Sequence, residues 1–97
     1  MDVGKRPAQT EDVDASRNIA ELLFAKRTEL DLNQADMART LGVSQANYSR
    51  WETSQSVPAP EAWEALSAFL NVDESEMGRA LLATGRAIAE RKRLHRR

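Results

Sequence analysis

Residues 41–44, LGVS, place a residue that commonly ends helices two positions before one that commonly begins them. Glycine adopts the left-handed backbone that follows a helix C-terminus at little steric cost. A serine hydroxyl accepts a hydrogen bond from the first turn of a new helix. We therefore expect one helix to end near Gly42 and the next to begin at Ser44. A turn of about three residues between two short helices is typical of a helix-turn-helix.

Helical periodicity surrounds this turn. From Ser16, taken as an N-cap, apolar side chains recur at helical spacing to Leu30 and predict a helix of about four turns. Asn33 begins a second helix, and Asp36 three positions later resembles a capping box. The stretch TSQSVPAP predicts a loop, and Pro60 suits the first turn of a fourth helix. The apolar stripe of that helix is expected at Ala62, Trp63, Leu66, Phe69 and Leu70.

A fifth helix is predicted after Asn71, with Asp73 and Glu76 as its cap. Its expected seam packs either on the first helix or on a second copy of the chain, and the sequence leaves both open. That seam consists of Met77, Leu81, Thr84 and Ile88. No segment shows strand-like alternation, so the fold class expected is all-α with five helices. We expect a flexible leader at 1–15, a helix-turn-helix domain at 16–72, and a C-terminal helix with a basic tail at 73–97.

Composition excludes several classes of protein. Ninety-seven residues suffice for one small domain, and no apolar run reaches the roughly 20 residues that span a bilayer. The N-terminus lacks a signal peptide, which favours a cytoplasmic location. Without cysteine, and with His95 as its single histidine, the chain is not expected to bind a metal or a cofactor. It also lacks a nucleophile beside a base and a glycine-rich phosphate loop, so we do not expect an enzyme.

The small net charge of −1 conceals an asymmetry. Residues 79–97 carry seven basic side chains against one glutamate, a net of +6. Residues 1–78 carry seven basic and 14 acidic side chains, a net of −7. A basic end on an acidic body is a weak indication of contact with a polyanion.

The segment 44–53 has two chemically different sides. At about 100° per residue, Tyr48 and Trp51 fall on the side of Ser44 and are expected to anchor the helix in the core. The outward arc carries Gln45, Ala46, Ser49 and Arg50, with Asn47 on its border. Glutamine and asparagine can pair with adenine, arginine with guanine, and an alanine methyl group with that of thymine. This arc therefore favours contact with DNA bases over a polar face without a partner.

The stretch LNQADMARTLGVSQANYSRWETS, followed by PEAWEALSAFLNV, resembles the lambda-repressor-like (Cro/C1, Xre-type) family of bacterial and phage regulators. The resemblance covers about residues 17–72. It implies that Gln34 contacts a DNA phosphate and supports Gln45, which contacts a base. It also implies that Ala46, Ser49 and Arg50 face the major groove, and that Arg27 and Glu52 form an interhelical salt bridge. Asn33, Asn47 and Thr53 complete the candidate DNA contacts.

Two departures from the family pattern affect the expected binding. Tyr48 replaces the usual isoleucine or valine, so the core must accommodate a ring and its hydroxyl. The loop after Glu52 reads TSQSV instead of carrying basic residues. Fewer cations release fewer counterions, which predicts weaker DNA binding unless the basic tail RKRLHRR compensates.

The resulting hypothesis is a sequence-specific regulator of transcription, expected to be a repressor. It would bind double-stranded DNA as a homodimer on a short inverted repeat. The alternative keeps the fold but makes it an interaction module, such as an antitoxin. In that case residues 73–97 bind a protein partner, and residues 79–97 become ordered only in the complex.

Overall fold

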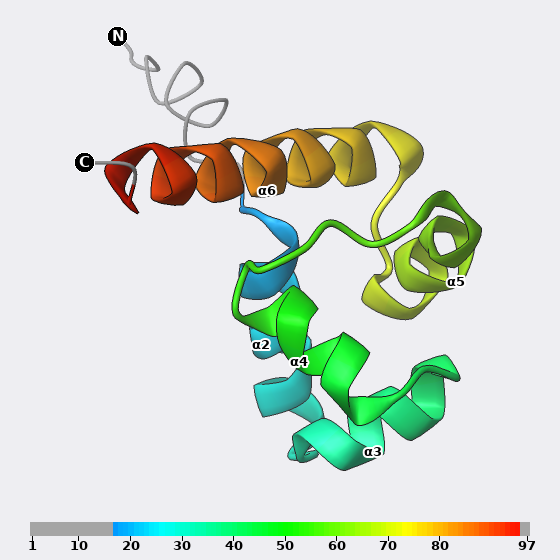
Figure 1. Cartoon of the computed structure of the whole chain (residues 1–97). Coiled ribbons are helices and arrows are strands. Elements are labelled where there is room, and N and C mark those ends of the chain that lie inside the picture. Colours follow the sequence, from blue (N-terminus) through cyan, green and yellow to red (C-terminus); the bar gives the residue numbers. More distant parts are fainter. Residues whose placement is uncertain (1–16, 96–97) are drawn as a thin grey trace, which may run out of the picture.

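The computed structural model describes residues 17–95 and shows an all-α protein (Figure 1). Its five helices are α2 (Ile19–Leu30), α3 (Gln34–Leu41), α4 (Gln45–Glu52), α5 (Pro60–Leu70) and α6 (Glu74–His95). Within residues 17–95 there is no strand, so the expected five-helix, all-α architecture is confirmed. The leader expected at 1–15 and the last two residues of the basic tail lie outside the described residues.

The first helix begins later than predicted. Its N-cap is Asn18, not Ser16, because Asn18 forms a complete capping box with Glu21. The Asn18 Oδ1 atom accepts from the Glu21 backbone N–H at 2.9 Å, and Glu21 Oε1 accepts from the Asn18 N–H at 3.0 Å. Ser16 has Ile19 three residues later, which offers no side-chain acceptor for the reciprocal bond.

The other predicted boundaries are confirmed. Asn33 caps α3 through a capping box with Asp36, and Gly42 ends it in the left-handed conformation with φ 74°. The Ser44 side chain caps α4. Before α6, Asp73 Oδ1 accepts from the Glu76 N–H at 2.7 Å. These caps satisfy backbone donors that a helix leaves unpaired at its ends.

Helix α2 occupies the centre of the fold and contacts α4, α5 and α6, whereas α3 packs mainly on α4 (Figure 1). The core contains side chains from all five helices, namely Ile19, Leu22, Leu23, Met37, Ala38, Tyr48, Trp51, Leu66, Leu70, Met77 and Ala80. Thr84 is a fully buried polar residue. Its Oγ1 accepts from the Ile19 N–H at 2.9 Å and donates to the Ala80 carbonyl at 2.8 Å. One hydroxyl thereby joins the start of α2 to the middle of α6.

Four apolar side chains are less buried than predicted. Trp63 was expected in the packed stripe of α5 but is 38% exposed, and its Nε1–H donates to the Pro58 carbonyl at 2.8 Å. Leu30, at the end of α2, is 45% exposed. On α6 the buried positions are Met77, Ala80 and Thr84, while Leu81 and Ile88 are only half-buried. Of the predicted seam, Met77 and Thr84 are therefore buried, Leu81 packs partly against the core, and Ile88 is half-buried.

Candidate nucleic-acid interface

Helices α3 and α4 form the helix-turn-helix, joined by Gly42, Val43 and Ser44. The Val43 N–H donates to the Ala38 carbonyl at 2.9 Å, and the Gly42 N–H donates to the Arg39 carbonyl at 3.2 Å. These bonds close the end of α3 and direct the chain into the next helix. Ser44 Oγ then accepts from the Asn47 N–H at 3.1 Å, so the relative placement of the two helices follows from the three linking residues and their hydrogen bonds.

Helix α4 has one buried side and one exposed side. Tyr48 is fully buried and Trp51 is 3% exposed. Their rings meet edge to face, with centroids 6.4 Å apart and an interplanar angle of 64°. Such aromatic pairs add stabilisation beyond the area that they bury. The two rings therefore hold an eight-residue helix that would be marginal in isolation.

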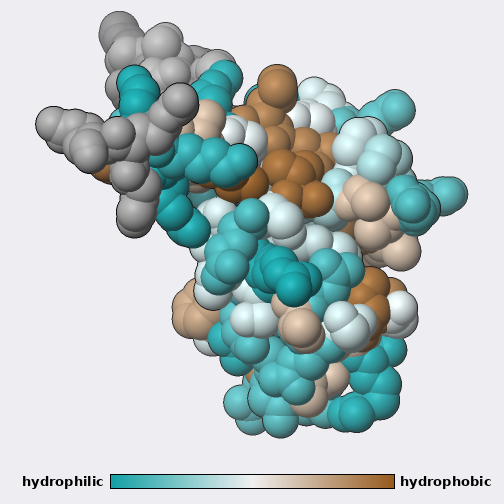
Figure 2. All heavy atoms as spheres, viewed as in Figure 1, coloured by the Kyte–Doolittle hydropathy of each residue, from teal (hydrophilic) through white to brown (hydrophobic). Residues whose placement is uncertain are grey.

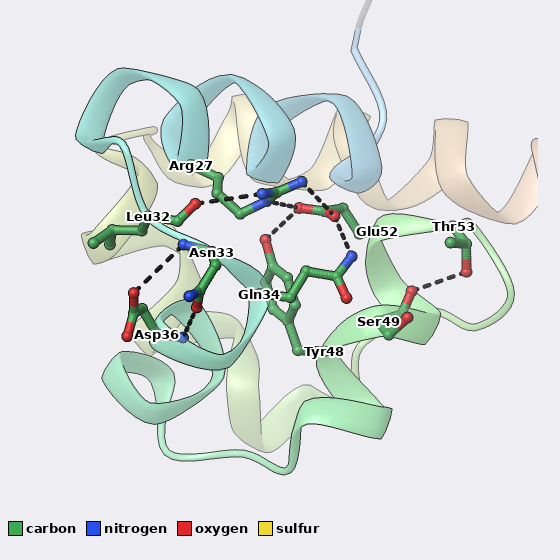
Figure 3. Close-up of polar contacts among 9 residues, drawn as sticks. All are labelled: Arg27, Leu32, Asn33, Gln34, Asp36, Tyr48, Ser49, Glu52 and Thr53. Atoms are coloured by element: carbon green, nitrogen blue, oxygen red, sulfur yellow. Dashed lines mark hydrogen bonds and ion pairs between the residues drawn. The ribbon is translucent and has the colours of Figure 1, made fainter.

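A polar cluster behind α4 gathers side chains from three helices (Figure 3). Arg27 extends from α2, Gln34 from α3, and Tyr48 and Glu52 from α4. Arg27 Nε donates to Glu52 Oε2 at 2.8 Å, and Arg27 Nη2 donates to Glu52 Oε1 at 3.2 Å. Gln34 Nε2 donates to Glu52 Oε1 at 2.7 Å, and the Tyr48 hydroxyl donates to Glu52 Oε2 at 2.6 Å. The carboxylate at the end of α4 thus accepts four hydrogen bonds.

These contacts determine the protonation of the cluster. Burial on its own would raise the pKa of Glu52, but the hydrogen bonds from Arg27, Tyr48 and Gln34 outweigh it, and the pKa is lowered. The hydrogen bond to Glu52 raises the pKa of Arg27. Desolvation, followed by the bond to the carboxylate, raises the pKa of Tyr48. The cluster is therefore an ionised Arg–Glu pair with a neutral tyrosine at neutral pH.

The candidate base-contacting residues lie on the outer side of α4. Gln45, Ala46 and Arg50 are exposed, and Asn47 and Ser49 are half-buried beside them. Gln45 occupies the first helical position, next to the cap, and Arg50 lies in the last turn. The structure therefore brings these five residues onto one eight-residue helix, with three of them fully accessible to a partner.

Three other candidate residues have polar groups already in use. Asn33 Oδ1 accepts from the Asp36 N–H, and the Thr53 hydroxyl donates to the Ser49 carbonyl at 2.9 Å. The Gln34 amide donates to Glu52. Within residues 17–95, no hydrogen bond joins Gln34 to Gln45. A role for these residues in DNA binding stays a prediction, and for Gln34 it requires the amide to share or leave its bond to Glu52.

Two contacts near this face were missed by the sequence analysis. The Tyr48 hydroxyl bonds to Glu52 four residues later, a helical spacing that could have indicated the pair. Arg91 of α6 donates from Nη2 to the Thr53 carbonyl at 2.8 Å, across 38 residues of sequence. No local pattern predicts such a pairing, which depends on how α6 lies against the end of α4.

Comparison with known proteins agrees with this geometry. A family model described as helix-turn-helix matches residues 23–77, from α2 into the start of α6. The chain belongs to the Cro/C1-type (lambda-repressor-like) helix-turn-helix family. Searches of the curated proteins and of the solved structures found no significant match.

Membership of this family makes the chain a DNA-binding helix-turn-helix protein of regulatory type. The matched region contains both helices of the motif, the polar cluster behind them and the outward side of α4. None of the helices between residues 17 and 95 is long and apolar enough to cross a membrane. That same part of the chain contains no group of three potential metal-binding side chains.

Proposed function

We propose that this protein is a sequence-specific transcriptional repressor that contacts the DNA major groove with the outer side of α4. The observation that supports this most strongly is the division of α4 into two sides. Tyr48 and Trp51 are buried, while Gln45, Ala46 and Arg50 are exposed on the same helix. The buried side anchors the helix, and the exposed side offers the groups that distinguish base pairs.

The polar cluster supports the same function by orienting α4. Glu52 joins the end of α4 to Arg27 of α2 and to Gln34 of α3. A base-contacting helix must be held rigidly, because a hydrogen bond to a base edge tolerates little displacement. The Arg27–Glu52 pair therefore acts on DNA recognition indirectly, through the placement of Gln45 and Arg50.

The chemistry of the exposed side suggests which base pairs are recognised. The Gln45 amide can donate to and accept from the edge of adenine, and the Arg50 guanidinium can donate twice to guanine. The Ala46 methyl group suits contact with a thymine methyl group. We propose that two copies place these groups on two half-sites of an inverted repeat about one helical turn apart, in bacterial or phage DNA.

The acidic composition of residues 1–78 predicts a binding energy that depends more on base contacts than on phosphate contacts. Exposed cations at Arg50, Lys92 and Arg93 supply part of the electrostatic attraction. Few neutralised phosphates give a shallow dependence of affinity on salt. The protein should therefore need a well-matched operator to bind tightly at physiological ionic strength.

The test begins with an unbiased selection of DNA sequences bound by the full chain at a stated salt concentration. Affinity for the selected operator is then measured for Gln45→Ala and Arg50→Ala. Each change should cost about 1–3 kcal/mol and relax the preference at a single base position. Arg86→Ala, which removes an exposed arginine from α6, serves as the matched control and should retain the wild-type preference.

If both α4 variants bind all sequences as tightly as the wild type, α4 does not recognise bases and the proposal is wrong. Repression itself is tested separately, with a reporter gene carrying the selected operator across its promoter. Expression should fall when the wild-type chain is present and recover with Arg50→Ala. An increase in expression with the wild type would instead identify an activator.

We favour this function over an antitoxin or interaction module. That alternative expects residues 79–97 to become ordered only with a protein partner. The described part of this segment is helical through His95, and Thr84 is buried against α2. Recovery of a stoichiometric toxin-like protein with the full chain, together with loss of operator selectivity, would reverse this preference.

A further inference from the structure

A hollow lies between α4 and the start of α5, beside the outer side of α4. Its floor contains Val43, Trp51 and Ala62, which belong to the core or pack against it. Arg50 lines the hollow from α4, and Val57 lines it from the loop before α5. In Figure 2 the surface over α3 and α4 is mainly hydrophilic. A hollow with an apolar floor therefore adjoins the polar side of α4 that we propose contacts bases.

The charges of the hollow indicate which part of DNA it suits. Its two charged side chains are Arg50 and Glu61, the latter from the first turn of α5. Neither forms a salt bridge with another residue between 17 and 95. A carboxylate repels a phosphate group, and the two opposite charges give the hollow no net charge. It therefore suits an uncharged, apolar group at the edge of a base better than it suits the DNA backbone.

Val57 is held firmly at the rim of this hollow. Two residues before it, the Gln55 N–H donates to the Arg50 carbonyl at 2.8 Å. One residue after it, Pro58 is buried, and its carbonyl accepts from Trp63 Nε1 at 2.8 Å. A residue that precedes proline is restricted to an extended backbone, and a β-branched side chain has few rotamers. A contact made by Val57 therefore loses little conformational entropy.

Val57 is nevertheless accessible to a partner. It is 39% exposed, whereas Trp51 on the floor of the hollow is 3% exposed. Arg50 beside it is exposed as well, and its guanidinium has no hydrogen-bond partner within the described part of the chain. The hollow thus presents a rigid apolar side chain next to a free arginine, on the same edge of α4.

The major groove of DNA places a methyl group close to the atoms that an arginine contacts. Arginine donates to O6 and N7 of guanine, and the 5-methyl group of thymine lies in the same groove. Successive bases of one strand are about 3.4 Å apart along the helix axis. A pyrimidine next to that guanine therefore brings its 5-methyl group to about van der Waals distance from the guanidinium. An apolar side chain beside Arg50 can cover it.

We propose that the hollow between α4 and α5 binds the 5-methyl group of a pyrimidine adjacent to the guanine contacted by Arg50, with Val57 as the specificity-determining residue. This proposal rests on the proposed function, because it requires α4 in the major groove. It adds a base contact from outside α4. It also gives a role to the loop TSQSVPAP, which has no cation to offer a phosphate group. Thymine and 5-methylcytosine share the methyl group, and both fit the hollow.

The test uses the full chain and the DNA sequences that it selects. The guanine contacted by Arg50 is the one whose preference is lost in Arg50→Ala, and thymine should stand next to it. Replacing this thymine by uracil removes only the methyl group. Affinity should fall about fourfold when one half-site is changed, which corresponds to about 0.8 kcal/mol for one buried methyl group. It should fall about fifteenfold when both half-sites are changed.

Two variants assign the effect to Val57. Val57→Ser should bind the thymine and uracil operators equally well. Leu82→Ser, which removes an exposed leucine from α6, is the matched control and should discriminate between them as the wild type does. Each comparison of thymine with uracil is made within one variant, so that a change in folding stability cancels from the ratio.

Cytosine and 5-methylcytosine at the same position distinguish the two sources of the methyl group. The wild type should bind 5-methylcytosine about fourfold more tightly than cytosine. Val57→Ser should bind both alike. The tighter of the thymine and 5-methylcytosine operators identifies the base that the hollow fits better.

Several results would overturn the proposal. They are selected sequences without thymine beside the guanine, equal affinity for thymine and uracil, or a difference that persists in Val57→Ser. An equal loss of affinity for both operators in Val57→Ser would instead place Val57 against a sugar. In all these cases a base preference that depends on Gln45 and Arg50 leaves the proposed function intact. If Arg50→Ala and Gln45→Ala change no preference, both proposals are wrong.

Discussion

Replacing Glu52 by glutamine tests whether the polar cluster holds α4 in place. The change keeps the shape of the side chain but removes its charge and one acceptor oxygen. In the wild type both oxygens accept two hydrogen bonds each, from Arg27 Nε and Nη2, Gln34 Nε2 and the Tyr48 hydroxyl. The new amide presents an NH₂ group to one of these two pairs of donors.

The expected loss of stability follows from the number of hydrogen bonds that the amide cannot accept. The Tyr48 hydroxyl can turn and accept from the new NH₂ group, which leaves one Arg27 donor without an acceptor. A hydrogen bond to a charged group contributes about 1.5–3 kcal/mol, and breaking a buried ion pair costs about 3–5 kcal/mol. We expect Glu52→Gln to lower the free energy of unfolding by about 3 kcal/mol. For a domain of this size that corresponds to a fall of roughly 12 °C or more in Tm.

The assay is urea unfolding followed by tryptophan fluorescence, to which Trp51, buried beside Tyr48 in the folded protein, and the more exposed Trp63 both contribute. Glu29→Gln is the matched control, because it makes the same chemical change in an exposed ion pair with Lys26. Surface pairs contribute about 0–1 kcal/mol, so the control should unfold close to the wild type. If Glu52→Gln is no less stable than Glu29→Gln, the cluster does not stabilise α4 and this reasoning is refuted.

The difference between wild type and Glu52→Gln should depend on pH. The pKa of Glu52 is lowered in the folded protein, whereas glutamate in an unfolded chain titrates near about 4.3. The stabilisation is therefore complete above about pH 4.3 and is lost as the pH falls through the folded value. Unfolding curves measured from pH 7 to pH 3 should converge at the acid end. A constant difference would show that the charge of Glu52 is not the cause.

Three further substitutions test single contacts by thermal unfolding. Thr84→Val leaves the buried Ile19 N–H without its acceptor and should cost about 1–3 kcal/mol, so an unchanged Tm would contradict that bond. Gly42→Ala places a side chain on a residue with φ 74° and should lower the free energy of unfolding by about 1–2 kcal/mol. A variant as stable as the wild type would refute this. Ser44→Ala removes the acceptor for the Asn47 N–H and should lower the free energy of unfolding by about 1 kcal/mol. Ser44→Asp supplies a new acceptor and should retain most of the wild-type stability.

The starts and ends of the helices could largely be predicted because capping is local. The bonds of Asn33 and Ser44 reach only three residues along the chain, so the responsible residues are visible together in the sequence. The two sides of α4 were predictable for the same reason, since about 100° per residue separates Tyr48 from Arg50 in any helix. The one misplaced start arose where Asn18 and Glu21 formed a better cap than Ser16 could.

The candidate interface was only partly predictable. The sequence indicated that Gln45 and Arg50 face outward, but not that the Gln34 amide and the Thr53 hydroxyl are used inside the protein. Side chains of this kind have several partners within reach, and the packed helices decide which of them is used. The Tyr48 hydroxyl shows the same dependence, because Glu52 accepts its bond while also accepting those of Arg27 and Gln34.

The sequence by itself determined five helices, a helix-turn-helix at Gly42, and a third helix with one aromatic and one polar side. These follow from spacing and caps, which act within one or two helical turns. Only the tertiary structure decided that Thr84 joins α6 to Ile19, 65 residues away, and that Arg91 reaches the end of α4. It also decided which side of α6 is packed on α2 and which remains at the surface. Contacts of this range depend on how whole helices lie against one another, and no local pattern of residues carries that information.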